Sequence, residues 1–172
     1  MSPETPNGPI LSFDVRGIPE SQGSMRAFVA GGRAHVVHGN PRSLLTWRAD
    51  IAAVAREVIG VDPLIVGPVQ VQLHFRLPRI QAHYTPKGVL RPSAPIYVST
   101  TPDLDKLIRA ALDALTGVAF MDDKQVCKLV ASKHYAGLEG PGVHVLVAHV
   151  QRQLAESRFG GALPAFRDER GG

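Results

Sequence analysis

The sequence predicts one α+β domain built from a mixed β-sheet and two main helices. The chain has 172 residues, close to the length of a single domain and enough to bury a full core. Residues 41–60 and 102–116 have the apolar spacing of amphipathic helices, and residues 69–77 alternate as a strand does. Strands and helices follow one another without a regular alternation, which is typical of the α+β class.

The composition excludes several classes of protein. Apolar residues make up 44% of the chain and charged residues 20%, which excludes a disordered, collagenous or coiled-coil protein. No apolar run is long enough to cross a membrane, and the N-terminus lacks the features of a signal peptide. The single cysteine, Cys127, cannot form an intrachain disulfide, which fits a reducing compartment. We therefore expect a cytoplasmic protein.

The charges are unevenly distributed along the chain. The net charge is +4, yet residues 21–49 and 63–102 contain no Asp or Glu while carrying several arginines and lysines. Five of the 15 acidic residues lie within residues 103–123. A basic protein with one acidic focus suits the binding of a polyanion and of a metal ion, although a solvated basic surface has the same pattern.

The N-terminal part of the chain is predicted to contain an arm, a strand and a hairpin. Residues 1–9 hold three prolines and a glycine and are expected to form a loose arm. Residues 10–17 are expected to form a strand. Two glycines separate residues 27–30 from residues 33–37, which predicts a β-hairpin with a two-residue loop.

The helix predicted over residues 41–60 has one apolar stripe, and Gly60 supplies a stop signal. Its arginines lie off the stripe, towards solvent or a partner. The stripe consists of Leu44, Trp47, Ile51, Val54, Ala55 and Val58.

A long loop separates the predicted strand at residues 69–77 from the second helix. Residues 78–100 contain four prolines and show no periodicity, and a loop of this length is usually functional or mobile. The second helix is expected over residues 102–116, with Thr101 as its cap and Pro102 at its first position. Its buried stripe is Leu104, Leu107, Ile108, Ala111 and Leu115, and its polar ridge is Asp105, Arg109 and Asp113.

The C-terminal part is predicted to contain two strands, over residues 126–133 and 143–150, joined by a glycine-rich connection. We expect the folded domain to comprise residues 10–152 and the last residues, 153–172, to form a loose tail.

Four carboxylates are the candidate metal ligands: Asp103, Asp105, Asp122 and Asp123. Converging carboxylates repel one another unless a cation lies between them, and hard oxygen ligands favour Mg²⁺ or Mn²⁺ over zinc. Such a site can hydrolyse phosphodiesters by activating a water molecule. Residues i and i+2 lie on opposite sides of a helix, so Asp103 and Asp105 can share a cation only if Asp103 lies where the chain changes from extended to helical.

Each part of this pattern also has an ordinary structural explanation. A carboxylate such as Asp103 is favourable near a helix N-terminus for electrostatic reasons alone. Asp122 and Asp123 suit a turn. Arg109 could form ion pairs with the carboxylates of its own helix.

The sequence Thr-Pro-Asp-Leu-Asp-Lys-Leu-Ile-Arg-Ala-Ala-Leu-Asp-Ala-Leu-Thr-Gly, followed by Asp-Asp-Lys-Gln-Val and then Lys133, resembles the RusA family of Holliday junction resolvases. The family pattern is Asp-x-Asp-Asn-x-x-Lys, a helix that ends in Asp-Ala-Leu, and Asp-Asp-x-Gln-[Ile/Val]. The likeness covers most of residues 10–150. It implies a RusA-like fold and a homodimer that makes Mg²⁺-dependent symmetric nicks in branched DNA such as a four-way junction, in recombination and repair.

The resemblance also implies a role for each matching residue. Asp103, Asp105 and Asp123 stand at the family's catalytic, metal-associated carboxylates, and Asp122 is the adjacent acid. Arg109 stands where the family usually has a catalytic lysine. Arginine keeps the charge that a phosphate needs but does not readily lose a proton.

Basic residues near the acidic focus and in the acid-free segments are the candidate DNA contacts. One of them, Lys106, stands where the family usually has asparagine. The candidates are Arg26, Arg33, Arg76, Arg79, Lys87, Arg91, Lys106 and Lys133.

Two other functions remain open at this point. Pro102-Asp103 followed by Asp122-Asp123-Lys124 also fits the short PD-(D/E)xK pattern of restriction-type nucleases, although those enzymes have a strand where this sequence favours a turn. The departures from the family pattern are also compatible with a branched-DNA-binding accessory protein whose metal site has decayed. Metal-dependent cleavage of branched DNA would separate the nucleases from the accessory protein.

Overall fold

The computed structural model describes residues 10–23, 25–30, 33–38 and 41–150. The arm and the tail expected at the two ends lie outside the described residues. The elements in chain order are β1 (Ile10–Arg16), β2 (Met25–Ala30), β3 (Arg33–His38), α1 (Pro41–Ile59), β4 (Val69–Leu77), the 3₁₀ turn η1 (Gln81–His83), α2 (Leu104–Leu115), the 3₁₀ turn η2 (Asp123–Gln125), β5 (Val126–Tyr135) and β6 (Gly142–His149).

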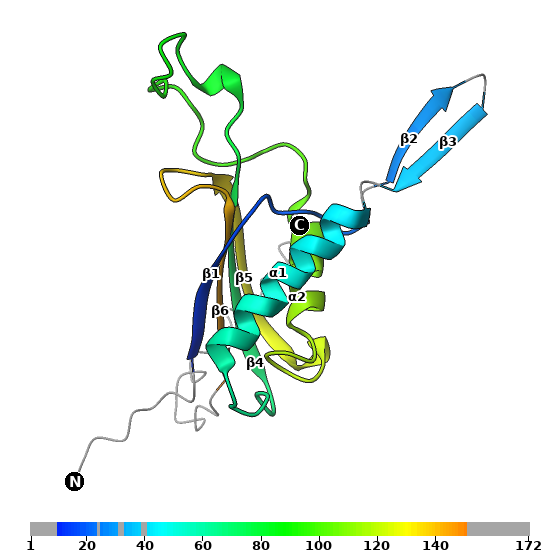
Figure 1. Ribbon diagram of the computed structural model, residues 1–172, viewed down its shortest axis with the longest axis vertical. Helices are drawn as coiled ribbons and strands as arrows, with labels where there is room; N and C mark the ends of the chain where they lie inside the picture. Colours follow the sequence, from blue (N-terminus) through cyan, green and yellow to red (C-terminus); the bar gives the residue numbers. More distant parts are fainter. Residues whose placement is uncertain (1–9, 24, 31–32, 39–40, 151–172) are drawn as a thin grey trace, which may run out of the picture.

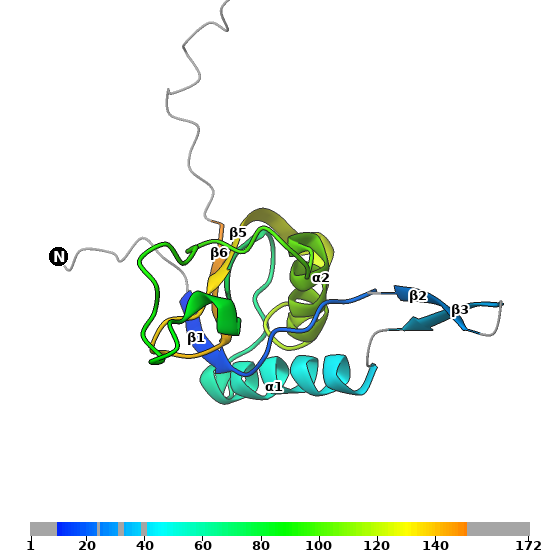
Figure 2. The ribbon, with the colours of Figure 1, turned by 90° about the horizontal axis from the view of Figure 1, so that it is seen from above.

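Four strands form a mixed sheet in the order β1-β6-β4-β5. The β4–β5 pair is parallel, whereas β6 is antiparallel to both β1 and β4. Both helices pack on the same face of this sheet, as Figure 1 and Figure 2 show. The predicted α+β class, with a mixed sheet and two main helices, is therefore confirmed.

The predicted hairpin is present as a separate two-stranded sheet of β2 and β3. Its register pairs Ala30 with Arg33, so two residues separate the strands, as the glycine pair predicts. The hairpin projects away from the helices and the four-stranded sheet (Figure 1, Figure 2).

The strand β4 has the predicted bounds and the predicted alternation. Val69, Val71, Leu73 and Phe75 are fully buried beneath the helices, and the residues between them face the other side of the sheet. Because β4 has a neighbour on each edge, its apolar side lies at the centre of the core.

The helix α1 buries a slightly different side from the one predicted. Ile51 and Ala55 are fully buried, as expected, but Val58 is 46% exposed and Ile59 is buried in its place. The buried side is centred nearer Ala55 than the sequence pattern indicates, so Ile59, one turn later, meets the core and Val58 lies at its margin.

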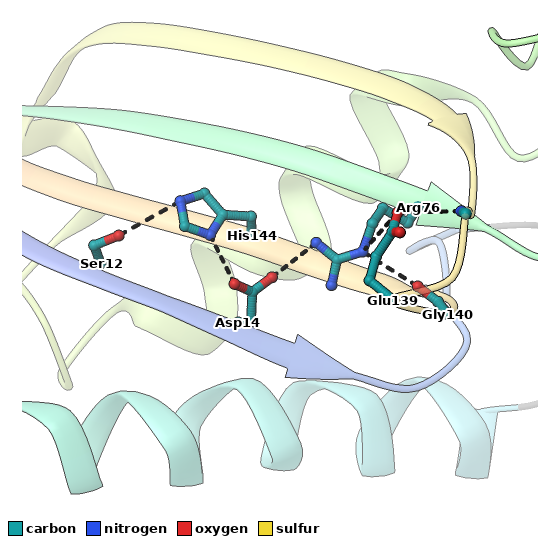
Figure 3. Close-up of polar contacts among 7 residues, drawn as sticks. Ser12, Asp14, Arg76, Glu139, Gly140 and His144 are labelled. Atoms are coloured by element: carbon teal, nitrogen blue, oxygen red, sulfur yellow. Dashed lines mark hydrogen bonds and ion pairs between the residues drawn. The ribbon is translucent and has the colours of Figure 1, made fainter.

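A polar network ties three strands together on the face of the sheet that the helices leave uncovered (Figure 3). The nearly buried guanidinium of Arg76 on β4 donates to Asp14 on β1 over 2.7 Å and to the carbonyl oxygen of Gly140 over 3.2 Å. Nδ1 of His144 on β6 lies 3.1 Å from the same carboxylate. Burial alone would raise the pKa of Asp14, but its hydrogen bonds with His144 and Arg76 outweigh burial and hold that pKa below its usual value.

None of the helices in the described part of the chain combines the length and the apolar character needed to cross a membrane.

Gly142 lies at the start of β6, where the backbone of β1 leaves no room for a side chain. A Cβ atom built on Gly142 would overlap the carbonyl oxygen of Val15 and meet the guanidinium of Arg76 at 3.0 Å. We expect Gly142→Ala to lower the free energy of unfolding by about 1–3 kcal/mol, because the strand backbone cannot move aside without breaking the ladder. Urea denaturation measures the change.

The control for this prediction is Leu138→Ala in the loop between β5 and β6. Leu138 is fully exposed, so its truncation should change the unfolding free energy by less than about 0.5 kcal/mol. Equal stability of the Gly142→Ala variant and the wild-type protein would contradict the close approach.

Candidate active site

Asp103 and Asp105 lie together at the N-terminus of α2. Asp103 is the residue before the helix and has an extended backbone (φ −67°, ψ 139°), whereas Asp105 lies in the first helical turn. Asp103 therefore occupies the junction that a shared cation would require. The prediction that Thr101 caps this helix and that Pro102 is its first residue is wrong, because both residues precede the helix. The residue at the N-cap position is Asp103, and its side chain makes no capping hydrogen bond.

Lys133 on β5 holds the segment that leads into α2. Its ammonium donates to the carbonyl oxygens of Thr100 and Pro102 over 2.6 and 2.7 Å. These bonds fasten the residues just before Asp103 to the sheet. Lys133, expected from the sequence as a DNA contact, thus also positions the first carboxylate.

Lys106 forms an ion pair with Asp103. The Lys106 ammonium lies 2.7 Å from a carboxylate oxygen of Asp103, and both side chains are partly exposed. The hydrogen bond and the charge of Lys106 hold the pKa of Asp103 below its usual range, and the charge of Lys133 lowers it further. Asp103 is therefore an ionised carboxylate at neutral pH, next to two cations.

Arg109 lies one helical turn after Asp105 and is exposed. The sequence suggests that Arg109 could pair with Asp113 of the same helix. Asp113 is instead paired with Arg48 of α1, at a distance of 3.5 Å. Among the described residues, no ion pair involves Arg109. A cation beside two carboxylates and without a counter-ion of its own can meet a phosphate.

Asp122 and Asp123 form the turn that the sequence predicts, at the start of β5. The carboxylate of Asp122 accepts from the backbone N–H of Lys124 over 3.0 Å and lies 2.9 Å from its ammonium. The side chain of Gln125 accepts from the Asp122 N–H and donates to carbonyl oxygens just before β4. This turn is not the strand that a PD-(D/E)xK nuclease would need at the same residues.

The two acidic pairs lie at opposite ends of α2. The helix has 12 residues and is therefore about 18 Å long. Along β5, the seven steps of the chain from Val126 to Lys133 span about 23 Å. Figure 1 shows α2 running alongside the sheet, with the turn before β5 at the end where β4 begins.

The expectation that all four carboxylates converge is therefore not met within one chain. The oxygen ligands have the right chemistry for Mg²⁺ or Mn²⁺. However, the described residues include no group of three or more His, Cys, Asp or Glu side chains close enough to hold a metal ion. Within one chain, the two acidic pairs therefore do not form a single cluster of ligands.

Three arginines that the sequence marks as DNA contacts are engaged within the protein. Arg76 is only 8% exposed and is paired with Asp14, so the structure assigns it to the sheet and not to a DNA surface. Arg79 donates to two backbone carbonyl oxygens over 3.0 and 3.1 Å, and Arg91 donates to one over 3.0 Å. Arg79 and Arg91 therefore donate to carbonyl oxygens of the protein itself.

Three further basic candidates lie on the long loop and on the hairpin. Lys87 is exposed in the long loop between β4 and α2. Arg26 and Arg33 lie on the two strands of the projecting hairpin. The partners Asp14 and His144 were missed by the sequence analysis. The alternation of β4 puts Arg76 on the polar face, but only the sheet register identifies what lies beside it.

The matched family is Endodeoxyribonuclease RusA, whose model aligns with residues 20–148. This range includes the two acidic pairs, Arg109 and Lys133. A protein of Bacillus subtilis (strain 168), described as uncharacterized protein YqaN, is 29% identical over 148 residues, which is 81% of this chain and 96% of the relative.

We expect Lys106→Met to raise the pKa of Asp103 towards its ordinary value, because the substitution removes the hydrogen bond and the charge that stabilise the carboxylate. An NMR titration of the Asp103 carboxyl carbon measures the change. Lys106→Arg is the matched control, since it keeps the charge and should keep the pKa low. The same pKa in Lys106→Met as in the wild-type protein would refute the ion pair.

Proposed function

The chain belongs to the RusA endodeoxyribonuclease family, and on that basis we propose that it resolves Holliday junctions and related branched DNA by paired symmetric nicks. The observation that carries the proposal is the junction at the start of α2. There, Asp103 and Asp105 lie on an extended-to-helical transition, with Arg109 one turn further on. We propose that it serves DNA recombination and repair in the cytoplasm.

The proposed cofactor is Mg²⁺, for which Mn²⁺ can substitute. Asp103, Asp105 and Asp123 would hold the cation, with Asp122 beside them. When bound, such a cation supplies an activated water and stabilises charge on the attacked phosphate. Arg109 would contact the phosphate itself, where its positive charge offsets the charge that develops during cleavage.

A site that uses both acidic pairs needs two chains. The pairs are separated by about the 18 Å length of α2 within one chain. A second copy can supply Asp122 and Asp123 to the Asp103 and Asp105 of the first. The same homodimer would carry two such sites related by a two-fold axis, which suits the two-fold symmetry of a four-way junction.

The projecting β2–β3 hairpin and the long loop before α2 are the proposed DNA-contacting segments. They carry Arg26, Arg33 and Lys87, three of the basic residues expected to bind phosphate. Both segments extend beyond the sheet and helices (Figure 1). Contacts with phosphates would attract DNA of any sequence, so we expect binding to weaken steeply with salt.

One observation favours a second candidate, a branched-DNA-binding protein that does not cut. Asp103, a proposed metal ligand, is already paired with Lys106 at 2.7 Å. In the nuclease, a cation would have to share this carboxylate with the lysine or displace it. Metal-dependent cleavage of a synthetic junction decides between the two functions.

Asp103→Asn, Asp105→Asn and Asp123→Asn should each reduce Mg²⁺-dependent cleavage of a synthetic four-way junction by about 100-fold or more, because each removes a ligand of the cation. Junction binding should persist, since loss of a negative charge does not weaken contacts with phosphate. Single-turnover cleavage and gel-shift titrations measure the two effects.

The control is Asp62→Asn, which changes an exposed acid after α1 and should cleave normally. A mixture of Asp103→Asn and Asp123→Asn chains tests whether the site is divided between two chains. If it is, a mixed dimer contains one site with both changes and one site with neither. Random mixing should restore about a quarter of wild-type activity. Full activity of the three single variants would refute the site, and no recovery on mixing would refute its division between chains.

We expect Arg109→Lys to retain substantial cleavage, since it keeps a positive charge one turn after Asp105. Arg109→Ala should lose about 2–4 kcal/mol of transition-state stabilisation, with little change in junction binding. Single-turnover rates at saturating protein measure both variants. An alanine variant that cuts at the wild-type rate would mean that Arg109 is only a helix-surface residue.

A further inference from the structure

The strand β5 lies at an edge of the sheet, and the protein covers only part of that edge. Near its end, Lys133 accepts a backbone hydrogen bond from Val98, and Tyr135 donates one to Ile96. Residues alternate in the direction of their backbone groups, so Leu129 and Ala131 face the same outer side as Lys133 and Tyr135. Among the described residues, neither Leu129 nor Ala131 has a backbone partner on that side.

The uncovered stretch of β5 is apolar on both of its faces. Leu129, opposite Val71, lies on the helix-covered side of the sheet and is 40% exposed. Val130 lies on the other side and is 45% exposed. An edge with free backbone groups and exposed apolar side chains is a site for pairing with another strand.

We propose that this edge of β5 is the dimer interface, where β5 pairs antiparallel with β5 of a second copy. The inference rests on the dimeric nuclease proposed above and names its contact surface. The two sheets would join into one continuous sheet across a two-fold axis at Leu129, because residues 133 and 135 of this edge are already paired with Val98 and Ile96. Because antiparallel pairing is self-complementary, the same residues serve on both copies.

Charge and position support a second copy as the occupant of this edge. A two-fold axis at Leu129 sets Val126 of the second copy opposite Ser132, just before the covered end of β5. The acidic turn before Val126 therefore approaches the end of β5 that carries Lys133. Neighbouring strands are about 5 Å apart, so the pairing brings the second copy's Asp122 and Asp123 towards Asp103.

Disulfide cross-linking tests the interface directly. Single cysteines are placed at Leu129, Val130 and Ala131 in a Cys127→Ser background and oxidised. Facing residues on antiparallel strands have Cα atoms about 4.5–5.5 Å apart, within the range of a disulfide. We expect the cysteine at Leu129, on the axis, to give a covalent dimer on a non-reducing gel. Ser12→Cys in the same background is the control, because Ser12 is exposed on β1 at the opposite edge.

A second test disrupts the interface. Leu129→Lys would bring like charges together across the axis, so light scattering should show the mass halved while the circular dichroism spectrum of the folded chain is unchanged. Leu138→Lys, the same change at a fully exposed loop position, should remain dimeric. A dimer that forms no cross-link at the three β5 positions, or that persists in Leu129→Lys, would overturn the proposal.

Neither readout depends on DNA cleavage. A dimer that cross-links through β5 but fails to cut junctions would refute the proposed function and leave the interface standing. A protein that cuts junctions as a dimer, without cross-linking through β5, would refute the interface and leave the function standing.

Discussion

The parallel pairing of β4 with β5 is the constraint on which the rest of the structure depends. Two parallel strands cannot be joined by a tight turn, so the chain must return along the whole sheet between them. Here α2 makes part of that return, and its apolar side completes the core above β4. One consequence is that Asp103 and Asp105 lie where the strands end, whereas Asp122 and Asp123 lie where β5 begins. The separation of the acidic pairs follows from the topology.

The basic character of the chain does not translate directly into a DNA-binding surface. Arg76 neutralises Asp14 within the sheet, and Arg79 supplies donors to loop carbonyls. Lys133 fastens the entrance of α2, and Lys106 is paired with Asp103. A nearly buried cation such as Arg76 is stable only with such partners. Of the DNA contacts expected from the sequence, Arg26, Arg33 and Lys87 lie on segments that extend from the fold.

The edge of β5 connects this architecture to the proposed activity. One half of that edge is closed by the loop before α2, and the other half leaves backbone groups free beside Leu129 and Val130. An antiparallel partner at this edge would reverse the direction of β5, so the beginning of one strand would meet the end of the other. The direction of β5, which separates the two acidic pairs within one chain, would thereby bring the Asp122–Asp123 pair of one copy towards the Asp103–Asp105 pair of the other.

The sequence by itself determined the elements that depend on local pattern: the alternating strand β4, the glycine-paired hairpin, the two amphipathic helices and the turn at Asp122. It also identified the junction at Asp103, because a cation shared at i and i+2 demands a change of backbone conformation. Only the tertiary structure decided that Ile59 replaces Val58 in the core, that Arg76 belongs to Asp14, and that the acidic pairs lie apart. These outcomes depend on sheet register and on the path of the crossover, which bring together residues far apart in the chain and leave no local periodicity to read.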